Sequence, residues 1–532
     1  MKWKKITADP FAMMEKYHVG PLTGSILASS GFEKETIEEI LDQDATITIS
    51  HAGCIEKACQ RILLAKSRHE KVFVGGDYDA DGICSTAIMK RTLDRLGIEN
   101  GYYIPDRFKE GYGLHASTVK LAYEKGYRLI ITVDNGVKAH EALQCAKDLG
   151  MDVIVTDHHQ IEEEIEADIV VHPDYMEEEY AFLSGAGVAY QIALNLLGQV
   201  DDTLTALCAV ALIGDVMPLY RQTRKTVRRG ISLISRGIPY SLAKLLYRPG
   251  PCTEMDIAFS IVPKLNSIGR MEDRSNVNTL IPFLLSENTQ AIDAYVASLN
   301  QVNERRKQLS AQMSEKAEAL LQEDEDFAIL HDPSFAEGIC GLVAGRIAGS
   351  YHKPVLVMSE NGDLLKGSGR SVEGFDLFSF LSGFEKKEAF GGHKAAVGIS
   401  IKKENLPELC AYVHENMKDV DLSGFEMETP AIVIDPSVIT FDTVMDLSCL
   451  SPYPKDLLQP YFMLENPKIK EVVKAGKTVR YIVDTGKGTL EAVAFPSKNL
   501  PLVPHPSYLV GTVSINRYRG SVKLQMNLED LL

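Results

Sequence analysis

The sequence contains no run of about 18 apolar residues, the minimum length for a helix that spans a bilayer. Its first residues, MKWKKITADPFAMMEKYHVG, are basic at the start but lack the apolar stretch of a signal peptide. The nine cysteines form no CxxC pair and no regular pattern, which favours reduced thiols over a disulfide framework. From these absences we expect a cytoplasmic protein with no membrane segment.

Basic residues are outnumbered, with 56 Lys and Arg against 73 Asp and Glu and a formal net charge of −17. This balance argues against a protein that coats nucleic acid over its whole surface, although it is compatible with a local basic channel. Cations bound to clustered carboxylates would offset part of the negative charge. At about 150 residues per domain, the 532 residues predict roughly three to four domains.

Apolar segments alternate with helical patterns from about residue 71, as in KVFVGG, RLIITVDNG and MDVIVTDHH. Continuous apolar strands of this kind predict a parallel sheet covered on both faces. Residues 286–324 contain no Pro or Gly and predict one long helix that joins two domains. A second α/β unit is expected over about 326–415, and short strands with Gly and Pro turns after about residue 425 predict a small barrel.

Three of the predicted strands end in acids or histidines. The side chains are Asp77, Asp79 and Asp81 after the first strand, Asp134 and Asn135 after the second, and Asp157, His158 and His159 after the third. Because the carboxyl ends of parallel strands share one edge of a sheet, we expect these groups to converge there. Carboxylates and imidazoles together suit Mn²⁺, and Mg²⁺ less ideally. Two such ions would activate water for in-line attack on phosphorus.

A structural interpretation competes with this one at each single position. An aspartate after a strand is usually a helix cap or a turn residue, and an isolated histidine is usually a surface or core group. The adjacent pair His158–His159 beside Asp157 is less common, and all three strands show the same pattern. The agreement between the strands favours a metal site.

The motifs DYDADG, VDNG and TDHH, in this order, resemble the DHH phosphoesterase superfamily. LIGDVMPL, which contains Asp215, resembles the fourth motif of that superfamily. Further stretches resemble its RecJ family of single-stranded-DNA exonucleases: IPDRFKEGYGL, PKLNSIGRMED, KGSGRS and FGGHKAAVGIS, the last two being similar to the DHHA1 domain. The resemblance covers about residues 70–400. The chain departs from the family at Gly214, where Ala is common, and at LSPYPKDLLQPYF, where a PFGxGNPxP-like stretch is usual.

The resemblance implies a role for each matching residue. The implied metal ligands, with Asp134 bridging two Mn²⁺ or Mg²⁺ ions, are Asp77, Asp79, Asp81, Asp134, His158 and Asp215. His159 would contact the scissile phosphate, and Asp157 would orient a neighbouring imidazole.

The resemblance also implies substrate contacts. Arg107, Ser368 and Arg370 would bind a 5′-phosphate, for which a guanidinium fork is well suited. Asn266 and Arg270 would line the path of the strand, and His393 would contact the nucleotide backbone. Without the family context, KGSGRS is a plain turn and GGHKAAVG a tight turn that opens a helix. In the C-terminal barrel, SINRYRGSVKLQ offers Arg517, Tyr518, Arg519 and Lys523 for gripping a single strand.

The implied fold class is α/β, with a parallel-sheet DHH domain and an α/β DHHA1 domain joined by a long helix, and a C-terminal OB-like β-barrel. The expected divisions are an N-terminal helical segment (1–60), the DHH domain (61–285), the connecting helix (286–325), the DHHA1 domain (326–420) and the OB-like domain (421–532).

The implied activity is 5′-to-3′ hydrolysis of single-stranded DNA to 5′-mononucleotides, in DNA repair and recombination. The implied partners are single-stranded DNA, a single-strand-binding protein and a RecQ-type helicase. Three alternatives stay open: a DHH–DHHA1 phosphodiesterase of short oligonucleotides or cyclic dinucleotides, a non-enzymatic scaffold, and a pyrophosphatase. The complete ligand set disfavours the scaffold, and Gly75 occupies a position that is histidine in the pyrophosphatases.

Overall fold

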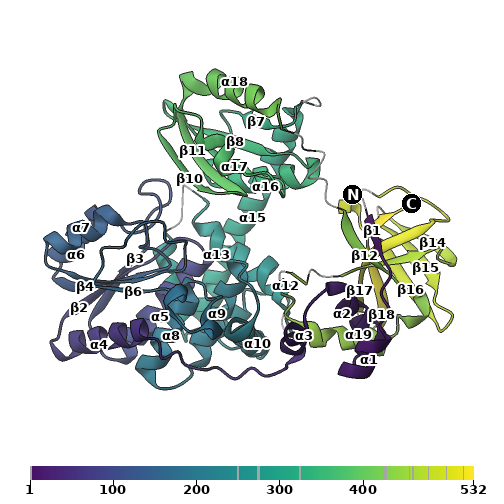
Figure 1. The fold of residues 1–532 in the computed structure, drawn as a ribbon, viewed down its shortest axis with the longest axis horizontal. Helices are drawn as coiled ribbons and strands as arrows, with labels where there is room; N and C mark the ends of the chain where they lie inside the picture. The colour runs from purple at the N-terminus through teal and green to yellow at the C-terminus, as the bar shows by residue number, and fades with distance from the viewer. Residues whose placement is uncertain are drawn as a thin grey trace. The chain divides into compact units, whose positions relative to one another are not determined.

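The computed structural model describes residues 3–248, 251–271, 276–322, 325–420, 422, 428–454, 456–457, 460–476, 478–498, 500–518 and 521–532. They form two compact units (Figure 1). The larger unit comprises Ile49–Asp215 and Gly230–Met427. The smaller unit is assembled from three separate segments, Met1–Thr48, Val216–Arg229 and Glu428–Leu532.

A five-stranded parallel sheet forms the first part of the larger unit, in the order β3-β2-β4-β5-β6. The strands are β2 (Lys71–Gly75), β3 (Asn100–Tyr103), β4 (Tyr127–Val133), β5 (Asp152–Thr156) and β6 (Ile169–Val171). Val72, Phe73 and Val74 follow one another in β2 and are all buried, because helices cover both faces of the sheet. The predicted parallel sheet is therefore confirmed.

Five helices accompany this sheet: α4 (Gly53–Ser67), α5 (Ala80–Arg95), α6 (Ala116–Glu124), α7 (His140–Asp148) and α8 (Gly185–Leu197). Val119 of α6 and Leu143 of α7 pack with Ile130 and Val155 of the strands in one apolar cluster. Full burial of each such side chain stabilises the fold by about 1.5–3 kcal/mol. Elsewhere in the unit α5 packs against α8 and α9 (Asp202–Gly214), which fixes the loop that precedes α5.

More helices follow α9 and lead to the second sheet. They are α10 (Arg221–Ser235), α11 (Tyr240–Ala243), α12 (Glu254–Asp256), η3 (Ile257–Ile261), α13 (Val262–Ile268), α14 (Leu280–Leu285) and α15 (Thr289–Ala319). The last is the long helix predicted over 286–324. Asn288 caps it, because Asn288 Oδ1 accepts hydrogen bonds from the backbone N–H groups of Gln290 and Ala291, both at 3.1 Å.

A mixed five-stranded sheet, in the order β10-β11-β9-β8-β7, follows the long helix. Its elements are β7 (Ala328–His331), α16 (Glu337–Tyr351), β8 (Val355–Asn361), β9 (Leu364–Arg370), α17 (Leu377–Ser382), β10 (Ala389–His393), β11 (Ala396–Lys402) and α18 (Leu406–Met417). β7 and β8 are parallel, and the other neighbours are antiparallel. KGSGRS lies on strand β9, and GGH ends strand β10, so neither forms the plain turn that its glycines suggest.

The smaller unit contains an eight-stranded sheet, in the order β1-β12-β13-β17-β18-β16-β15-β14. Its strands are β1 (Trp3–Ile6), β12 (Thr429–Val433), β13 (Tyr461–Glu465), β14 (Ile469–Ala475), β15 (Thr478–Asp484), β16 (Thr489–Ala494), β17 (Tyr508–Tyr518) and β18 (Ser521–Leu531). Its helices are α1 (Phe11–Tyr17), α2 (Pro21–Ser30), α3 (Lys34–Leu41) and α19 (Phe441–Asp446). The β character predicted after residue 425 is confirmed, and among the described strands β1 and β14 are the two edges.

The structure divides residues 1–60 differently from the expected separate helical segment. Trp3–Ile6 is a strand that pairs in parallel with β12, and Leu22 and Ile26 of α2 pack with Phe462 of β13 in one core. From Ile49 onward the chain belongs to the larger unit. The sequence WKKI is too short to show a strand pattern, and its pairing partner lies more than 400 residues away along the chain.

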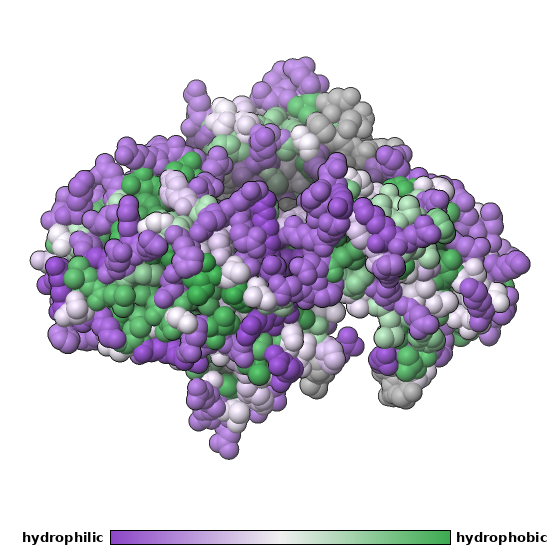
Figure 2. Space-filling model, turned by 60° about the horizontal axis from the view of Figure 1, so that its bottom comes forward, coloured by the Kyte–Doolittle hydropathy of each residue, from purple (hydrophilic) through white to green (hydrophobic). Residues whose placement is uncertain are grey.

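Hydrophilic residues predominate on the face drawn in Figure 2, where hydrophobic residues form separate patches. Leu63 and Leu64 of α4 are among the exposed apolar side chains of the molecule. Over the described ranges, no helix combines the length and the apolar character needed to cross a membrane.

Candidate metal centre and phosphate pocket

The loop between β2 and α5 holds three aspartates close together. Asp79 caps α5, since its Oδ1 accepts hydrogen bonds from the N–H groups of Asp81 (3.0 Å) and Gly82 (3.1 Å). A β-carbon at Gly82 would lie 2.6 Å from Asp77 Cβ, so only glycine lets Asp77 pack against the first turn of the helix. Asp77 and Asp81 are 1% and 2% exposed. Helix capping and metal binding are therefore compatible here, because Asp79 Oδ2 takes no part in the cap.

Asp134 follows β4 in a left-handed backbone conformation, with φ at +61°. This region is rarely populated by residues other than glycine, and it turns the Asp134 carboxylate toward the loop before α5. The backbone N–H of Asp134 donates to the Thr156 carbonyl at 3.0 Å, which ties the turn to the next strand.

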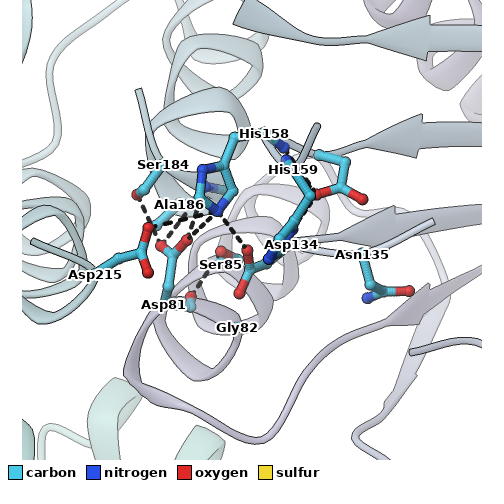
Figure 3. A network of polar contacts seen from close by, with 12 residues as sticks. Asp81, Gly82, Ser85, Asp134, Asn135, His158, His159, Ser184, Ala186 and Asp215 are labelled. Carbon is cyan, nitrogen blue, oxygen red and sulfur yellow. Dashed lines mark hydrogen bonds and ion pairs between the residues drawn. The ribbon is translucent and has the colours of Figure 1, made fainter. Parts of the chain in front are cut away.

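Asp81 is bound by the N-terminus of α8. One of its oxygens accepts hydrogen bonds from Ser184 Oγ (2.8 Å) and Ala186 N (2.9 Å), and the other accepts one from Gly185 N at 2.8 Å (Figure 3). Backbone donors at a helix N-terminus stabilise an anion, and they hold this carboxylate in one orientation.

His158 lies among three carboxylates from three different parts of the chain (Figure 3). Its Nε2 is 3.2 Å from Asp134 Oδ1, 3.6 Å from Asp215 Oδ2 and 3.7 Å from Asp81 Oδ2. Asp215 is the residue directly after α9, which brings it to this edge of the sheet. The side chains at the strand ends therefore converge as expected.

Within the described residues, three sets of side chains have ligand atoms within 4.8 Å of one another. The sets are Asp77, Asp79 and Asp134; Asp81, His158 and Asp215; and Asp134, His158 and His159. Asp134 and His158 each belong to two sets, so the sets are contiguous. Because Asp134 belongs to two sets, its carboxylate would be within reach of a cation bound in either of them.

The electrostatics of the site favour cation binding. Burial, together with the neighbouring carboxylates, raises the pKa of Asp77 and Asp134 well above the usual value. The same two causes raise the pKa of Asp79, and that of Asp215 to about 8. Burial lowers the pKa of His158, which leaves its imidazole neutral and able to act as a ligand.

Unpartnered oxygens provide a test of whether cations fit. Asp77 Oδ1, Asp134 Oδ1 and Asn135 Oδ1 are buried, and none has a hydrogen-bond donor among the described residues. A buried acceptor without a partner costs about 1–3 kcal/mol. Divalent cations would remove this cost at Asp77 and Asp134, which belong to the ligand sets, and carboxylate oxygens with imidazole nitrogen fit Mn²⁺ and Mg²⁺.

Asp157 and His159 form a separate pair beside this cluster. Asp157 Oδ1 lies 2.7 Å from His159 Nδ1 and accepts the N–H of His158 at 2.8 Å, while Oδ2 accepts the N–H of Val137 at 3.0 Å. Burial lowers the pKa of His159, but the hydrogen bond and charge of Asp157 outweigh it and raise this pKa to about 9. With Nδ1 held by Asp157, Nε2 is the nitrogen of His159 that can contact a substrate.

A second group of cationic side chains lies in the larger unit. Arg107 and Ser368 line one cavity of about 370 Å³, together with Lys366 and Phe390. Ser368 and Arg370 both point toward Gly341, since a β-carbon there would lie 3.4 Å from Ser368 Oγ and 3.1 Å from an Arg370 Nη. The three residues expected to bind a 5′-phosphate are thus neighbours.

Arg270 adds to this positive charge. Burial, and then the charge of Arg107, lower the pKa of Arg270 to about 10, and the same two causes lower that of Arg370. In the part of the chain that the structure describes, none of these three arginines forms an ion pair with a carboxylate. Like charges that lie close together without a carboxylate partner among the described residues favour the binding of an anion.

The other expected substrate residues are placed less closely. Asn266 lies on α13, and its Oδ1 is buried without a partner among the described residues. His393 is exposed at the end of β10, where its Nδ1 accepts the N–H of Ala395 at 3.3 Å. In the smaller unit, Lys523 pairs with Glu491, whereas Arg519 and the side chain of Tyr518 lie outside the described residues.

Sequence reasoning missed several residues that shape the site. Ser184 and Gly185 bind Asp81, and Tyr112 donates a hydrogen bond from its hydroxyl to the Asp134 carbonyl at 2.8 Å. Tyr78 lies between two of the aspartates, with its ring against Tyr112. The SGAG stretch before a helical pattern was the available signal for an anion-binding helix start, and GYG was the signal for an unusual loop.

Comparison with protein families places three domains along the chain. The DHH family N-terminal domain matches residues 71–214, the DHHA1 domain matches 324–419 and the RecJ OB domain matches 431–530. Together with the two α/β sheets and the joining helix, these matches confirm the predicted fold class.

Proteins with similar sequences and structures support this domain assignment. The single-stranded-DNA-specific exonuclease RecJ of Bacillus subtilis is 31% identical, over 98% of this chain and 69% of its own length. The RecJ of Haemophilus influenzae is 29% identical, over 89% of each chain. The crystal structure of Thermus thermophilus RecJ in complex with Mn²⁺ superposes with a TM-score of 0.84 at 25% identity, covering 99% of this chain and 79% of that one. The chain therefore belongs to the RecJ family of single-stranded-DNA-specific exonucleases.

Proposed function

We propose that this protein hydrolyses single-stranded DNA from its 5′ end and releases 5′-mononucleotides, with two Mn²⁺ or Mg²⁺ ions at the site. The observation that carries the proposal is the pair of contiguous ligand sets that share Asp134, beside an arginine group that has no carboxylate partner among the described residues. The ligand sets suit divalent cations, and the arginine group suits a terminal phosphate. One end of a DNA strand can therefore contact the cations and the arginines together.

The residues proposed to hold the cations are Asp77, Asp79, Asp81, Asp134, His158 and Asp215. When bound there, the two cations supply Lewis acidity for the attack of water on phosphorus. The protein contributes ligand side chains that are held in fixed positions. Asp79 is held by its cap on α5, Asp81 by the start of α8, and His158 lies among three carboxylates.

His159 is proposed to act on the scissile phosphate. The charge of Asp157 keeps its imidazole protonated at neutral pH, so that Nε2 carries a proton and a positive charge. It can donate a hydrogen bond to a phosphate oxygen and offset the charge that builds up during attack. Asp157 remains the anion that orients the ring.

The arginine group is proposed to select the 5′ end. Arg107, Ser368 and Arg370 would hold the terminal phosphate, while Arg270, Asn266 and His393 would contact the strand behind it. Binding of the end in this pocket sets which phosphodiester reaches the ligand sets. A path too narrow for a duplex would give the single-strand selectivity.

Each of the expected domains is proposed to have its own role. Residues 61–285 carry the ligand sets, the helix within 286–325 joins them to the pocket of 326–420, and the OB-like domain of 421–532 grips the strand. A single-strand-binding protein and a RecQ-type helicase are proposed as partners that supply the substrate. A cytoplasmic location is part of the same proposal, and all nine cysteines are free thiols.

End-labelled oligonucleotides test the proposal directly. Single-stranded and duplex DNA and RNA are digested with Mn²⁺, Mg²⁺ or a chelator, and products are resolved over time. We expect metal-dependent release of mononucleotides from the 5′ end of single-stranded DNA. Asp134→Ala and His158→Ala should abolish it, while Asp148→Ala, which removes an exposed carboxylate on α7 bonded to Gln144, should not.

The remaining alternative predicts a different substrate profile. A phosphodiesterase of short oligonucleotides or cyclic dinucleotides would cleave those substrates faster than long single strands. Preference for dinucleotides, or cleavage that persists in Asp134→Ala, would contradict the proposed activity.

A further inference from the structure

Tyr112 lies in a loop between β3 and α6 that is closed on itself. The N–H groups of Glu110 and Gly111 donate to the Asp106 carbonyl at 2.8 and 3.2 Å, and Glu110 Oε2 accepts hydrogen bonds from Tyr103 Oη (2.6 Å) and Asp106 N (2.8 Å). These contacts anchor the loop to the end of β3. These hydrogen bonds give the loop a fixed shape, with Arg107 near one end and Tyr112 near the other.

Two glycines give Tyr112 its position. Gly111 and Gly113 have φ of +88° and +79°, a region in which other residues are strained. The chain turns at both of them, so that the tyrosine reaches back toward the strand ends. A β-carbon at Gly113 would lie 3.6 Å from Asn135 Cβ, the residue next to Asp134.

The hydroxyl of Tyr112 lies close to two residues of the site, Asp134 and His159. It lies 2.8 Å from the Asp134 carbonyl oxygen and 3.3 Å from His159 Nδ1. Because Nδ1 is closer to Asp157 Oδ1, at 2.7 Å, the tyrosine proton goes to the carbonyl. Asp134 has the left-handed φ described above, and this hydrogen bond stabilises the peptide group that follows it.

The ring of Tyr112 contacts an aromatic side chain on each side, His159 and Tyr78. Its centroid lies 5.7 Å from that of His159 and 6.4 Å from that of Tyr78, each pair in an edge-on arrangement. The guanidinium carbon of Arg107 lies 5.2 Å from the Tyr78 ring centroid. Arg107, Tyr78, Tyr112 and His159 thus form a continuous series of contacts from the phosphate pocket to the ligand sets.

We propose that Tyr112 is a positioning residue that couples binding of the 5′-phosphate at Arg107 to the placement of Asp134 and His159. This rests on the proposed function. A phosphate that fixes Arg107 also fixes the loop, and through Tyr78 and the Tyr112 hydroxyl it holds the shared carboxylate and the imidazole. The terminal phosphate then accelerates the chemical step in addition to tightening binding.

The test uses the full chain, with single-stranded DNA bearing either a 5′-phosphate or a 5′-hydroxyl, and measures kcat and KM separately. The variant Tyr112→Phe keeps the ring and removes the hydroxyl. On 5′-phosphorylated DNA we expect kcat to fall by about tenfold, the effect of one lost hydrogen bond, with little change in KM. On 5′-hydroxyl DNA the loss should be clearly smaller, so the kcat advantage of the phosphate should shrink.

Four further variants complete the design: Tyr102→Phe, Arg107→Ala, the double variant Arg107→Ala/Tyr112→Phe, and Gly113→Ala. Tyr102→Phe is the matched control, because its hydroxyl bonds the Asn278 carbonyl at 3.3 Å and makes no contact with the site, so its kcat should match the parent. In an Arg107→Ala background, Tyr112→Phe should cost much less than it does alone. Gly113→Ala keeps the hydroxyl but displaces the loop, and it should reproduce the selective loss on phosphorylated DNA.

Several outcomes would overturn the coupling. They are equal losses on both DNA ends, full additivity with Arg107→Ala, or an unchanged kcat in Tyr112→Phe. Thermal unfolding of Tyr112→Phe separates a positioning defect from a folding defect, since coupling predicts an unfolding temperature near the parent value. If the parent itself cleaves no single-stranded DNA, the proposed function fails first, and that result is distinct from an unaffected variant of an active parent.

Discussion

Gly185 approaches Asp134 so closely that a β-carbon at position 185 would lie 2.5 Å from Asp134 Cβ and 2.6 Å from its Oδ1. The start of α8 therefore packs directly on the carboxylate shared by two ligand sets. The same glycine donates its N–H to Asp81. One residue without a side chain thus sets the distance between two acids that come from different strands.

Gly185→Ala should displace Asp134 and disable the site. A misplacement of about 1 Å commonly costs about 100-fold in rate, so we expect a loss of at least that size in metal-dependent cleavage. Gly53→Ala is a suitable control, because a β-carbon there meets no atom within 4 Å and the residue also opens a helix. Near-parental activity in Gly185→Ala would mean that Asp134 does not need its present position.

The metal-free protein should lose stability as the pH rises from about 6.5 to 8. In this window the folded state binds more protons than the unfolded state, because the pKa of Asp215 is raised from 3.8 to about 8 and that of His159 from 6.5 to about 9. Below pH 6.5 the lowered pKa of His158 acts in the opposite direction. Thermal unfolding with chelator checks the sign.

Saturating Mn²⁺ should flatten this pH dependence, since cations take the place of the protons on the carboxylates. Asp215→Asn should reduce the slope in chelator. A metal-free stability that rises with pH across the same window would contradict the assigned environment of these groups.

Arg370→Ala should weaken binding of a 5′-phosphate while making the free protein more stable. A hydrogen bond to a charged group contributes about 1.5–3 kcal/mol, so KM for 5′-phosphorylated DNA should rise by about 10- to 100-fold. The stabilisation is expected because Arg107 and burial both disfavour this guanidinium in the free protein. Arg346→Ala, which removes an exposed arginine near Glu318, should change neither quantity.

Asp157→Asn should lower kcat by about 10- to 100-fold, in the range for losing the partner of a working histidine. The amide cannot supply the charge that keeps His159 protonated or fix its ring in one tautomer. The matched control is Asp174→Asn, an exposed carboxylate 3.4 Å from His172. If pH–rate profiles of Asp157→Asn overlay those of the parent, His159 has no role as a charged donor.

The acids and histidines at the strand ends could be predicted because each motif is local. A strand, its terminal acid and the next helix are contiguous in sequence, and the topology of a parallel sheet brings the ends together. Asp215 was found only through the family resemblance, since its neighbours Asp81 and His158 are far away along the chain.

The residues that hold these groups in place could not be predicted in this way. Tyr112, Tyr78 and Gly185 act through contacts across loops, and nothing in their immediate sequence specifies a partner. The strand at Trp3–Ile6 was missed for the same reason. Its hydrogen-bonding partner is β12, and four residues carry too little pattern to be distinguished from a loop.

The smaller unit is built from segments that lie far apart in the sequence, and this has a consequence for biosynthesis. Ribosomes add roughly 5–20 residues per second. The strands that cover Leu22 and Ile26 are therefore synthesised tens of seconds after α2. Meanwhile the larger unit can complete its fold. We therefore expect the nuclease centre to fold before the OB-like unit, whose helix α2 exposes apolar side chains to aggregation until its partner strands have been synthesised.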